Sequence, residues 1–175
     1  MLDILDDLLK QALAKGADAA DAVHIESQSL AVAQRLGNPE KLERSESSDI
    51  GLRIFFGKRQ SIVSSSDTSS EALKELIDRA ISMAKVVPED PFCGLAETGQ
   101  LVTDIVDVDS YDPSEPTTEA LTDWANRAED AALAIPGITN SEGAEAGWGK
   151  AIVSVAGTNG FSQVYSSSHY SLSAS

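Results

Sequence analysis

The chain has 175 residues, 42% of them hydrophobic, and its 13 basic and 28 acidic side chains give a net charge of −15. This length suffices for one ordinary domain or two small ones. An electrostatic field of that sign repels phosphate backbones, so the composition argues against nucleic-acid binding. It predicts a solvated acidic surface, with attraction of basic peptides as the alternative role.

Membrane insertion and secretion find no support in the sequence. No apolar run approaches the ~20 residues that a membrane-spanning helix needs. Residues 1–10 carry three aspartates and no basic stretch before their apolar residues, unlike a secretory signal peptide. Cys93 is the only cysteine, so no intrachain disulfide can form. We therefore expect a cytoplasmic protein.

The first third of the chain reads as a helix followed by strands. Leucines at helical spacing over residues 2–13 predict a helix that Gly16 can end. Residues 23–36 alternate apolar and polar side chains in two phases, which predicts a long strand with a bend or bulge at 27–29. Residues 41–47 are polar and charged, and they fit an edge strand.

A clean period of two over residues 50–56 predicts a half-buried strand, and residues 60–66 return as its partner after a glycine turn. The spacing Thr68-x-x-Glu71 is typical of a capping box. It predicts the start of a second helix, which must stop before Pro88.

Residues 88–116 are acidic and punctuated by proline, which predicts a long surface connection with one short strand at 101–106. A third helix should start at 116–118 and end at 136–137. Its apolar side chains recur at helical spacing and predict a buried stripe of ordinary core residues: Leu121, Trp124, Ala125, Ala128, Ala132 and Ile135.

Three strands are predicted after this helix, at residues 138–145, 150–156 and 161–171, and a tight glycine turn joins the last two. The sequence then stops within apparent strand sequence. We therefore expect that the native protein continues beyond Ser175.

Together these elements predict an α+β fold with a mostly antiparallel sheet and packed helices. The predicted organisation is a first α+β unit at 1–87, an acidic connection at 88–116 and a second unit at 117–175. The similar sequences at 62–66 and 164–168 leave two interpretations open. Either two α-β-β-β repeats share one sheet, or serine-rich strands match by chance.

The sequence offers few candidate residues for catalysis. Zinc hydrolysis requires paired histidines and a glutamate on one helix face, whereas the two histidines, His24 and His169, stand alone in strand-like sequence. Cys93 lies in a predicted turn without a nearby base. His169 follows three serines, but neighbours on a strand point to opposite faces and form no dyad. We therefore assign no catalytic, cofactor-binding or metal residue to this chain.

Two further segments do not have the residue spacing of the ion-binding or phosphate-binding loops that they resemble. The acidic residues between Asp104 and Glu115 lack the glycine and the final glutamate of a calcium loop. Gly143, Gly147 and Gly149 precede Lys150 without the order that a phosphate loop requires, so they predict a turn between strands.

The predicted polar edge strand at 41–47 is a candidate peptide-binding site, because an unpaired strand can accept an extended peptide. The alternative is that its charges protect the edge from such pairing.

Short segments spread along the chain resemble the PmbA/TldD family, once described as modulators of DNA gyrase, in its PmbA (or TldE) branch. No single segment is specific, but their order over nearly the whole chain is. The segments lie at residues 16–21, 42–47, 64–67, 88–91, 94–96, 111–113, 138–143 and 169–173.

The resemblance implies one subunit of a cytosolic proteolytic system. In this family, TldD-like and PmbA-like subunits pair into a complex that cleaves unfolded peptides, including microcin precursors and antitoxins. The zinc motif His-Glu-x-x-x-His lies on the TldD-type chain, downstream of the N-terminal region, and no residue here matches it. We therefore expect zinc on a TldD-like partner. Pairing with that partner, or self-dimerisation, would use a C-terminal half outside this sequence.

The leading hypothesis is therefore the N-terminal region of a non-catalytic, PmbA/TldE-like subunit of a zinc metallopeptidase complex, with unfolded peptides as substrates. The alternative is a non-enzymatic module that binds a client through its acidic surface. A weaker third hypothesis is an independent hydrolase that uses Cys93.

Overall fold

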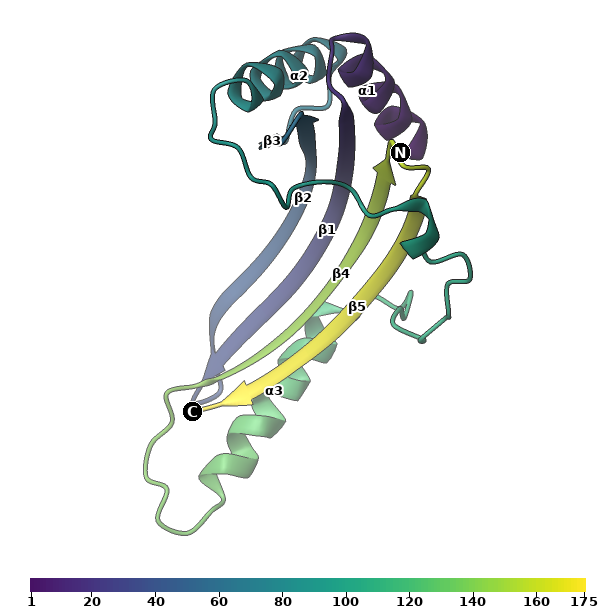
Figure 1. The fold of residues 1–175 in the computed structure, drawn as a ribbon. Helices are drawn as coiled ribbons and strands as arrows, with labels where there is room; N and C mark the ends of the chain where they lie inside the picture. The colour runs from purple at the N-terminus through teal and green to yellow at the C-terminus, as the bar shows by residue number, and fades with distance from the viewer. The chain divides into compact units, whose positions relative to one another are not determined.

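The computed structural model describes residues 1–175 and confirms an α+β fold with one five-stranded antiparallel sheet (Figure 1). The sheet order is β3-β2-β1-β4-β5. None of the helices is both long and apolar enough to cross a membrane. The elements are α1 (Leu2–Ala14), β1 (Ala19–Arg35), β2 (Asn38–Phe56), β3 (Arg59–Ser65), α2 (Ser70–Ala84), the 3₁₀ helix η1 (Thr98–Gln100), α3 (Thr118–Leu133), β4 (Ala144–Gly157) and β5 (Ser162–Ala174).

Two compact units form within the chain, and each combines three separated segments. Unit 1 consists of Met1–Glu26, Ser47–Asp107 and Ile152–Tyr165, and unit 2 consists of Ser27–Glu46, Val108–Ala151 and Ser166–Ser175. The four long strands β1, β2, β4 and β5 each contribute to both units. This division differs from the linear ranges 1–87, 88–116 and 117–175, which stay a prediction.

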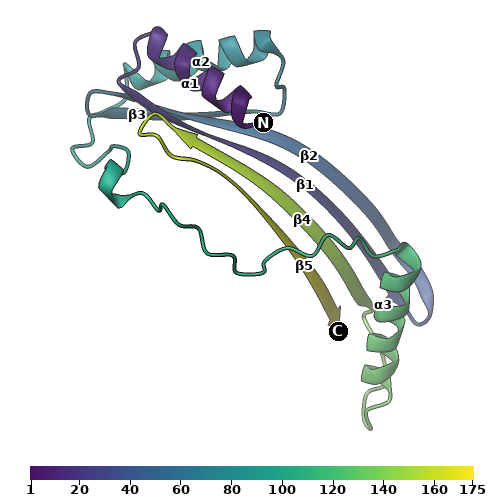
Figure 2. The same ribbon diagram turned by 90° about the vertical axis from the view of Figure 1, so that its right-hand side faces the viewer.

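The core of unit 1 lies between its two helices and the sheet (Figures 1 and 2). Ile50, Leu52 and Ile54 of β2 are fully buried, which confirms the predicted period of two. The helices α1 and α2 supply leucine, isoleucine and alanine side chains to the same cluster. In β1 the buried residues are the small Ala20 and Ala22, whose size lets the helices approach the backbone closely.

The predicted change of phase in β1 is wrong. Burial falls on even-numbered positions in both parts of the strand, from Ala20 to His24 and from Leu30 to Gln34. Ile25, which belongs to the apolar phase of the sequence before the predicted bend, is 39% exposed. The error arose because alanine carries a weak hydrophobic signal, so the larger side chains on the opposite face dominated the pattern.

Helix boundaries depend on caps that the sequence placed almost correctly. Gly16 follows α1 with a φ of 99°, the left-handed geometry that favours glycine. The second helix is capped by Ser69 rather than by Thr68, because the Ser69 hydroxyl accepts a hydrogen bond from the Ala72 N–H. The predicted strand at 101–106 does not form, and η1 lies just before it.

In unit 2 the helix α3 packs on β1 and β4 through a core cluster of Leu30, Val32, Leu121, Ala125, Ala144, Ala146 and Trp148. The strand predicted at 138–145 does not form as such. Instead β4 begins at Ala144 and continues without a break to Gly157. After α3 the second half therefore has two long strands rather than the three that an α-β-β-β repeat would require, which disfavours the repeat among the two interpretations.

The glycines of β4 lie within the strand and not in the predicted turn. A Cβ on Gly149 would lie 2.5 Å from His169 Cε1, and one on Gly147 would lie 2.7 Å from Ser171 Oγ. These glycines leave space for side chains of β5 that lie across β4.

A buried carboxylate holds the β1–β2 turn in unit 2. Leu36 and Gly37 form this turn with φ values of 49° and 73°. Glu129 of α3, which is 2% exposed, accepts their N–H groups at 2.9 and 3.4 Å. The Ser141 hydroxyl donates to the same carboxylate at 2.6 Å. These hydrogen bonds favour the ionised form, so the Ser141 bond above all lowers the pKa of Glu129.

We expect Glu129→Gln to lower the thermal midpoint of unfolding at neutral pH by about 5 °C. Glutamine replaces the charged carboxylate by a neutral amide. Its NH2 group cannot accept a hydrogen bond, although the site holds three hydrogen-bond donors. Because the folded-state pKa of Glu129 is depressed, its stabilisation is present above the unfolded pKa and is lost as the pH falls through the folded pKa. The difference between the proteins should therefore shrink in acid, measured by thermal melts from neutral to low pH. Exposed Asp130 provides the control, and an equal loss in Asp130→Asn would contradict the role of Glu129.

A second prediction compares two glycines of unit 2. Gly143 has a φ of 110° and a Cβ there would lie 2.8 Å from the Gln34 carbonyl oxygen, whereas Gly137 has a φ of 97° with open space. Both alanine variants gain backbone strain, but only Gly143→Ala also meets a fixed backbone atom. Urea unfolding should show Gly143→Ala less stable than Gly137→Ala by about 1–3 kcal/mol. Equal losses would mean that the Gln34 contact relaxes freely.

Candidate functional site

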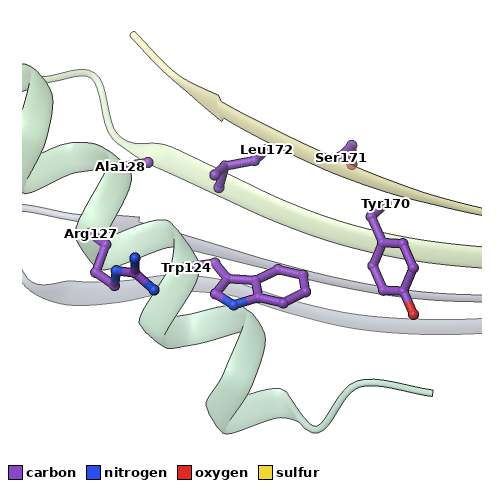
Figure 3. A pocket seen from close by; sticks show the side chains of 6 residues that line it. All are labelled: Trp124, Arg127, Ala128, Tyr170, Ser171 and Leu172. Atoms are coloured by element: carbon purple, nitrogen blue, oxygen red, sulfur yellow. The ribbon is translucent and has the colours of Figure 1, made fainter. Parts of the chain in front are cut away.

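An open apolar groove in unit 2 is the first candidate site (Figure 3). It has a volume of about 520 Å³ and lies between α3 and β5. Its lining residues are Trp124, Arg127, Ala128, Tyr170, Ser171 and Leu172. Leu172 is 55% exposed and Tyr170 is 42% exposed, so much of this apolar surface meets solvent.

Two aromatic rings define one end of the groove. The centroids of Trp124 and Tyr170 lie 5.8 Å apart at 63°, in an edge-to-face arrangement (Figure 3). The Tyr170 hydroxyl donates a hydrogen bond to the Ser114 carbonyl at 2.9 Å, which fixes the ring. The prediction that Trp124 is ordinary core is therefore only half right: one side packs on the core of unit 2 and the other lines the groove.

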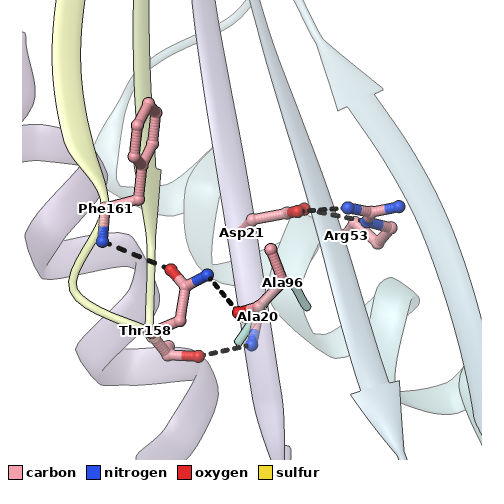
Figure 4. Close-up of polar contacts among 7 residues, drawn as sticks. Ala20, Asp21, Arg53, Ala96, Thr158 and Phe161 are labelled. Atoms are coloured by element: carbon pink, nitrogen blue, oxygen red, sulfur yellow. Dashed lines mark hydrogen bonds and ion pairs between the residues drawn. The ribbon is translucent and has the colours of Figure 1, made fainter. Parts of the chain in front are cut away.

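A smaller pocket in unit 1 contains an ion pair. It has a volume of about 390 Å³ and lies between the sheet and the segment 95–102. Asp21 and Arg53 form a bidentate pair in its wall, with Arg53 Nε 3.0 Å from Asp21 Oδ1 (Figure 4). The Arg53 guanidinium also lies 5.0 Å from the centroid of the Phe55 ring.

Hydrogen bonds from the β4–β5 turn hold the walls of this pocket (Figure 4). The Asn159 amide donates to the Ala96 carbonyl at 3.0 Å, and its oxygen accepts the Phe161 N–H at 3.3 Å. The Ala20 N–H donates to the Thr158 hydroxyl at 3.1 Å. The segment 95–102 is thereby tied to the sheet at Ala96.

The chemistry of this pocket is binding rather than proton transfer. The hydrogen bonds that Arg53 donates to Asp21 raise the pKa of Arg53, so the guanidinium stays charged. Asp21 is occupied by that guanidinium, and the remaining lining residues offer no nucleophile. An apolar pocket with one satisfied ion pair can orient a ligand but has no group that would activate it.

The two histidines and the cysteine are not brought together. His24 is 1% exposed, and its Nε2 lies 2.9 Å from the Ser48 hydroxyl in unit 1. His169 is exposed on β5 in unit 2. Cys93 is half-buried and has a free thiol, and its backbone N–H donates to the Asp90 carbonyl. No group of three His, Cys, Asp or Glu side chains could hold a metal ion, so these residues do not fit zinc.

The acidic residues between Asp104 and Glu115 are exposed. Asp112 Oδ1 accepts the Ser114 N–H at 2.8 Å, a local bond that lowers the pKa of Asp112. Sequence reasoning missed Glu129, the one buried carboxylate. A signal for it existed, because Glu129 follows Leu121 and Ala125 at four-residue intervals on the buried stripe of α3.

Comparison with known proteins agrees with this architecture. Residues 20–84 match the family model described as PmbA/TldA metallopeptidase domain 1. The chain is 30% identical over 174 residues to Metalloprotease PmbA of Escherichia coli O157:H7, which covers 97% of this chain and 39% of that protein. It is 32% identical over 162 residues to the Metalloprotease PmbA homolog of Haemophilus influenzae, with 92% and 36% covered.

Crystal structures of distant relatives share the fold. A protein of Bacteroides thetaiotaomicron described as a modulator of DNA gyrase superposes with a TM-score of 0.89 at 20% identity, over 98% of this chain and 40% of that chain. TldE from Thermococcus kodakarensis gives a TM-score of 0.73 at 16% identity, over 97% and 38%.

The architecture is therefore that of the N-terminal region of PmbA/TldD proteins, in agreement with the predicted resemblance. The chain matches the first domain of the PmbA/TldD family over residues 20–84 and is similar to proteins of its PmbA/TldE branch along nearly its whole length. It spans less than two-fifths of the length of the curated relatives that it matches.

The aromatic end of the groove makes a testable prediction. Tyr170→Ala removes the ring that shields one edge of Trp124, whereas Tyr170→Phe removes only the bond to Ser114. Acrylamide quenching of tryptophan fluorescence should rise in the alanine variant and change little in the phenylalanine variant. The other tryptophan, Trp148, is 2% exposed and should contribute little quenching. Equal quenching in both variants would mean that the ring does not cover Trp124.

Proposed function

We propose that this chain is the N-terminal region of a PmbA/TldE-like subunit in a cytoplasmic zinc metallopeptidase complex that degrades or processes unfolded peptides. In this proposal the chain itself is non-catalytic. It helps to enclose and steer extended peptides toward zinc held by a TldD-like partner subunit.

The observation that carries the proposal is the match along nearly the whole chain to proteins named metalloprotease PmbA. That name calls for a metal centre, and the side chains of residues 1–175 do not fit one. The ligands would then come from outside this sequence. The TldD-type subunit is the source that the family resemblance supports.

The groove of unit 2 supports a role in handling peptides. An extended chain points every second side chain to the same face, and an open apolar groove with two aromatic rings can hold apolar side chains from that face without demanding one sequence. The exposed acidic surface would favour basic segments of the same substrates. Both features bind a peptide and neither cleaves it.

The partner would join through segments outside this chain. The relatives are more than twice as long as the part that matches here. In the proposal, pairing with a TldD-like subunit, or self-dimerisation, uses segments like those that the relatives have beyond the matched region.

We expect the tagged full-length protein, purified with its natural partners from its own cells, to cleave an unstructured peptide. A zinc chelator should abolish the cleavage, because the metal supplies the activated water in such enzymes. The subunit purified alone should not cleave. Cleavage is measured by the appearance of peptide fragments with and without chelator.

Cys93→Ala is the matched control, because it should leave cleavage unchanged; loss of activity would favour a hydrolase that uses this thiol. If no metallopeptidase subunit co-purifies and no cleavage occurs, the peptidase proposal fails. A client that still binds, and that is released by charge reversal between Asp104 and Glu115, would then favour the interaction module.

A further inference from the structure

One edge of the sheet in unit 2 is an unpaired strand. In the sheet order, β2 lies between β3 and β1. Its register with β3 covers only residues 50–56, paired with residues 59–65. Residues 39–46 of β2 therefore have β1 on one side and no strand on the other (Figure 1), which confirms the predicted edge. None of the turn, loop or cap hydrogen bonds reaches their backbone.

The opposite edge of unit 2 is covered. The Ser168 N–H of β5 donates to the Ser110 carbonyl at 2.9 Å, and the Ser110 hydroxyl donates to the Ser166 carbonyl at 3.0 Å. The Asp112 N–H donates to the Ser168 hydroxyl at 2.8 Å. The connecting segment thus occupies hydrogen-bonding groups of β5, while β2 keeps a free row of backbone groups.

A pocket lies beside this free edge. It has a volume of about 530 Å³ and is lined by Leu30, Leu42, Arg44, Glu115, Pro116, Thr117, Thr118 and Glu119. Leu42 and Arg44 belong to the unpaired part of β2. Leu42 is 65% exposed, so an aliphatic side chain on an edge strand faces solvent next to a cavity. A strand added outside β2 would place alternate side chains beside Leu42 and Arg44.

The charges around this edge are mostly negative. Lys41 is already paired with Glu43 and Glu145, at 3.1 and 4.0 Å. Arg44 is paired with Glu46 at 3.1 Å and with Glu115 at 2.5 Å. Glu40 and Glu119 add two further carboxylates, so acidic groups outnumber basic ones here. A peptide with basic side chains complements this edge better than an acidic one.

We propose that residues 39–46 of β2 bind an extended peptide by strand addition, with an apolar side chain of the peptide in the pocket at Leu42 and basic side chains against the surrounding glutamates. The inference deepens the proposed function, since it identifies where the subunit holds a substrate and which substrate sequences it prefers. Backbone hydrogen bonds supply affinity, and the pocket and charges select alternating basic and apolar sequences.

The test measures binding of labelled synthetic peptides to the full-length protein by fluorescence anisotropy. A short peptide of alternating lysine and leucine should bind. The same peptide methylated on alternate backbone amides should lose binding, because a methylated edge cannot donate to β2. A glutamate–leucine peptide should bind more weakly than the lysine–leucine peptide.

Leu42→Lys should weaken binding of the lysine–leucine peptide by about tenfold or more, since it removes the apolar contact and adds a repelling charge. Ile62→Lys is the matched control, because Ile62 is 66% exposed on β3, which is also an edge strand. It adds the same charge away from the pocket and should leave binding unchanged.

Several results would overturn the proposal: no binding of the lysine–leucine peptide, equal binding of its methylated form, stronger binding of the acidic peptide, or equal losses in the two variants. The cleavage assay separates this failure from failure of the proposed function. If the complex cleaves peptides equally well with Leu42→Lys, the peptidase proposal stands without a role for this edge. If the edge binds the peptide but the protein never supports cleavage, the edge proposal stands and the peptidase proposal fails.

Discussion

The buried carboxylate of Glu129 is the constraint on which unit 2 depends. It joins α3 to the β1–β2 turn through the Leu36 and Gly37 N–H groups and to the start of β4 through Ser141. The Ser141 hydroxyl in turn accepts the N–H of Gly143 at 2.9 Å, and Gly143 is the glycine that passes the Gln34 carbonyl. One carboxylate thus links the hairpin turn, the segment before β4 and α3. A buried charge with three donors tolerates few other arrangements.

The position of α3 creates the two open surfaces of unit 2 that the proposals assign to peptides. On one side the helix and β5 leave the aromatic groove with Trp124 and Tyr170, and near its N-terminus the helix and β2 leave the pocket at Leu42. Both surfaces are open and largely apolar, and glutamates surround the second. The glycines of β4 contribute indirectly, because they let β5 side chains cross the strand without strain.

In the proposed function these surfaces hold peptides for chemistry carried out elsewhere. The histidines are separated between a buried site and an exposed strand, and the thiol lies apart from both. The similarity to PmbA proteins supports this proposed role, since the matching relatives are named as metalloproteases and extend well beyond this region. In the proposed function, such a subunit would contribute substrate selection and its partner would contribute the metal.

The sequence by itself determined the three helices, the hairpin of β2 and β3 and the exposed edge of β2, because each rests on local periodicity, turns and charge. It did not determine the face of β1 that is buried, since small alanines give a weak hydrophobic signal that only packing helices resolve. The length of β4 was decided by β5, whose side chains need the glycines that local reasoning assigned to a turn. The burial of Glu129 and the groove beside Trp124 were likewise decided by the tertiary structure, because donors and walls come from segments far apart in the chain.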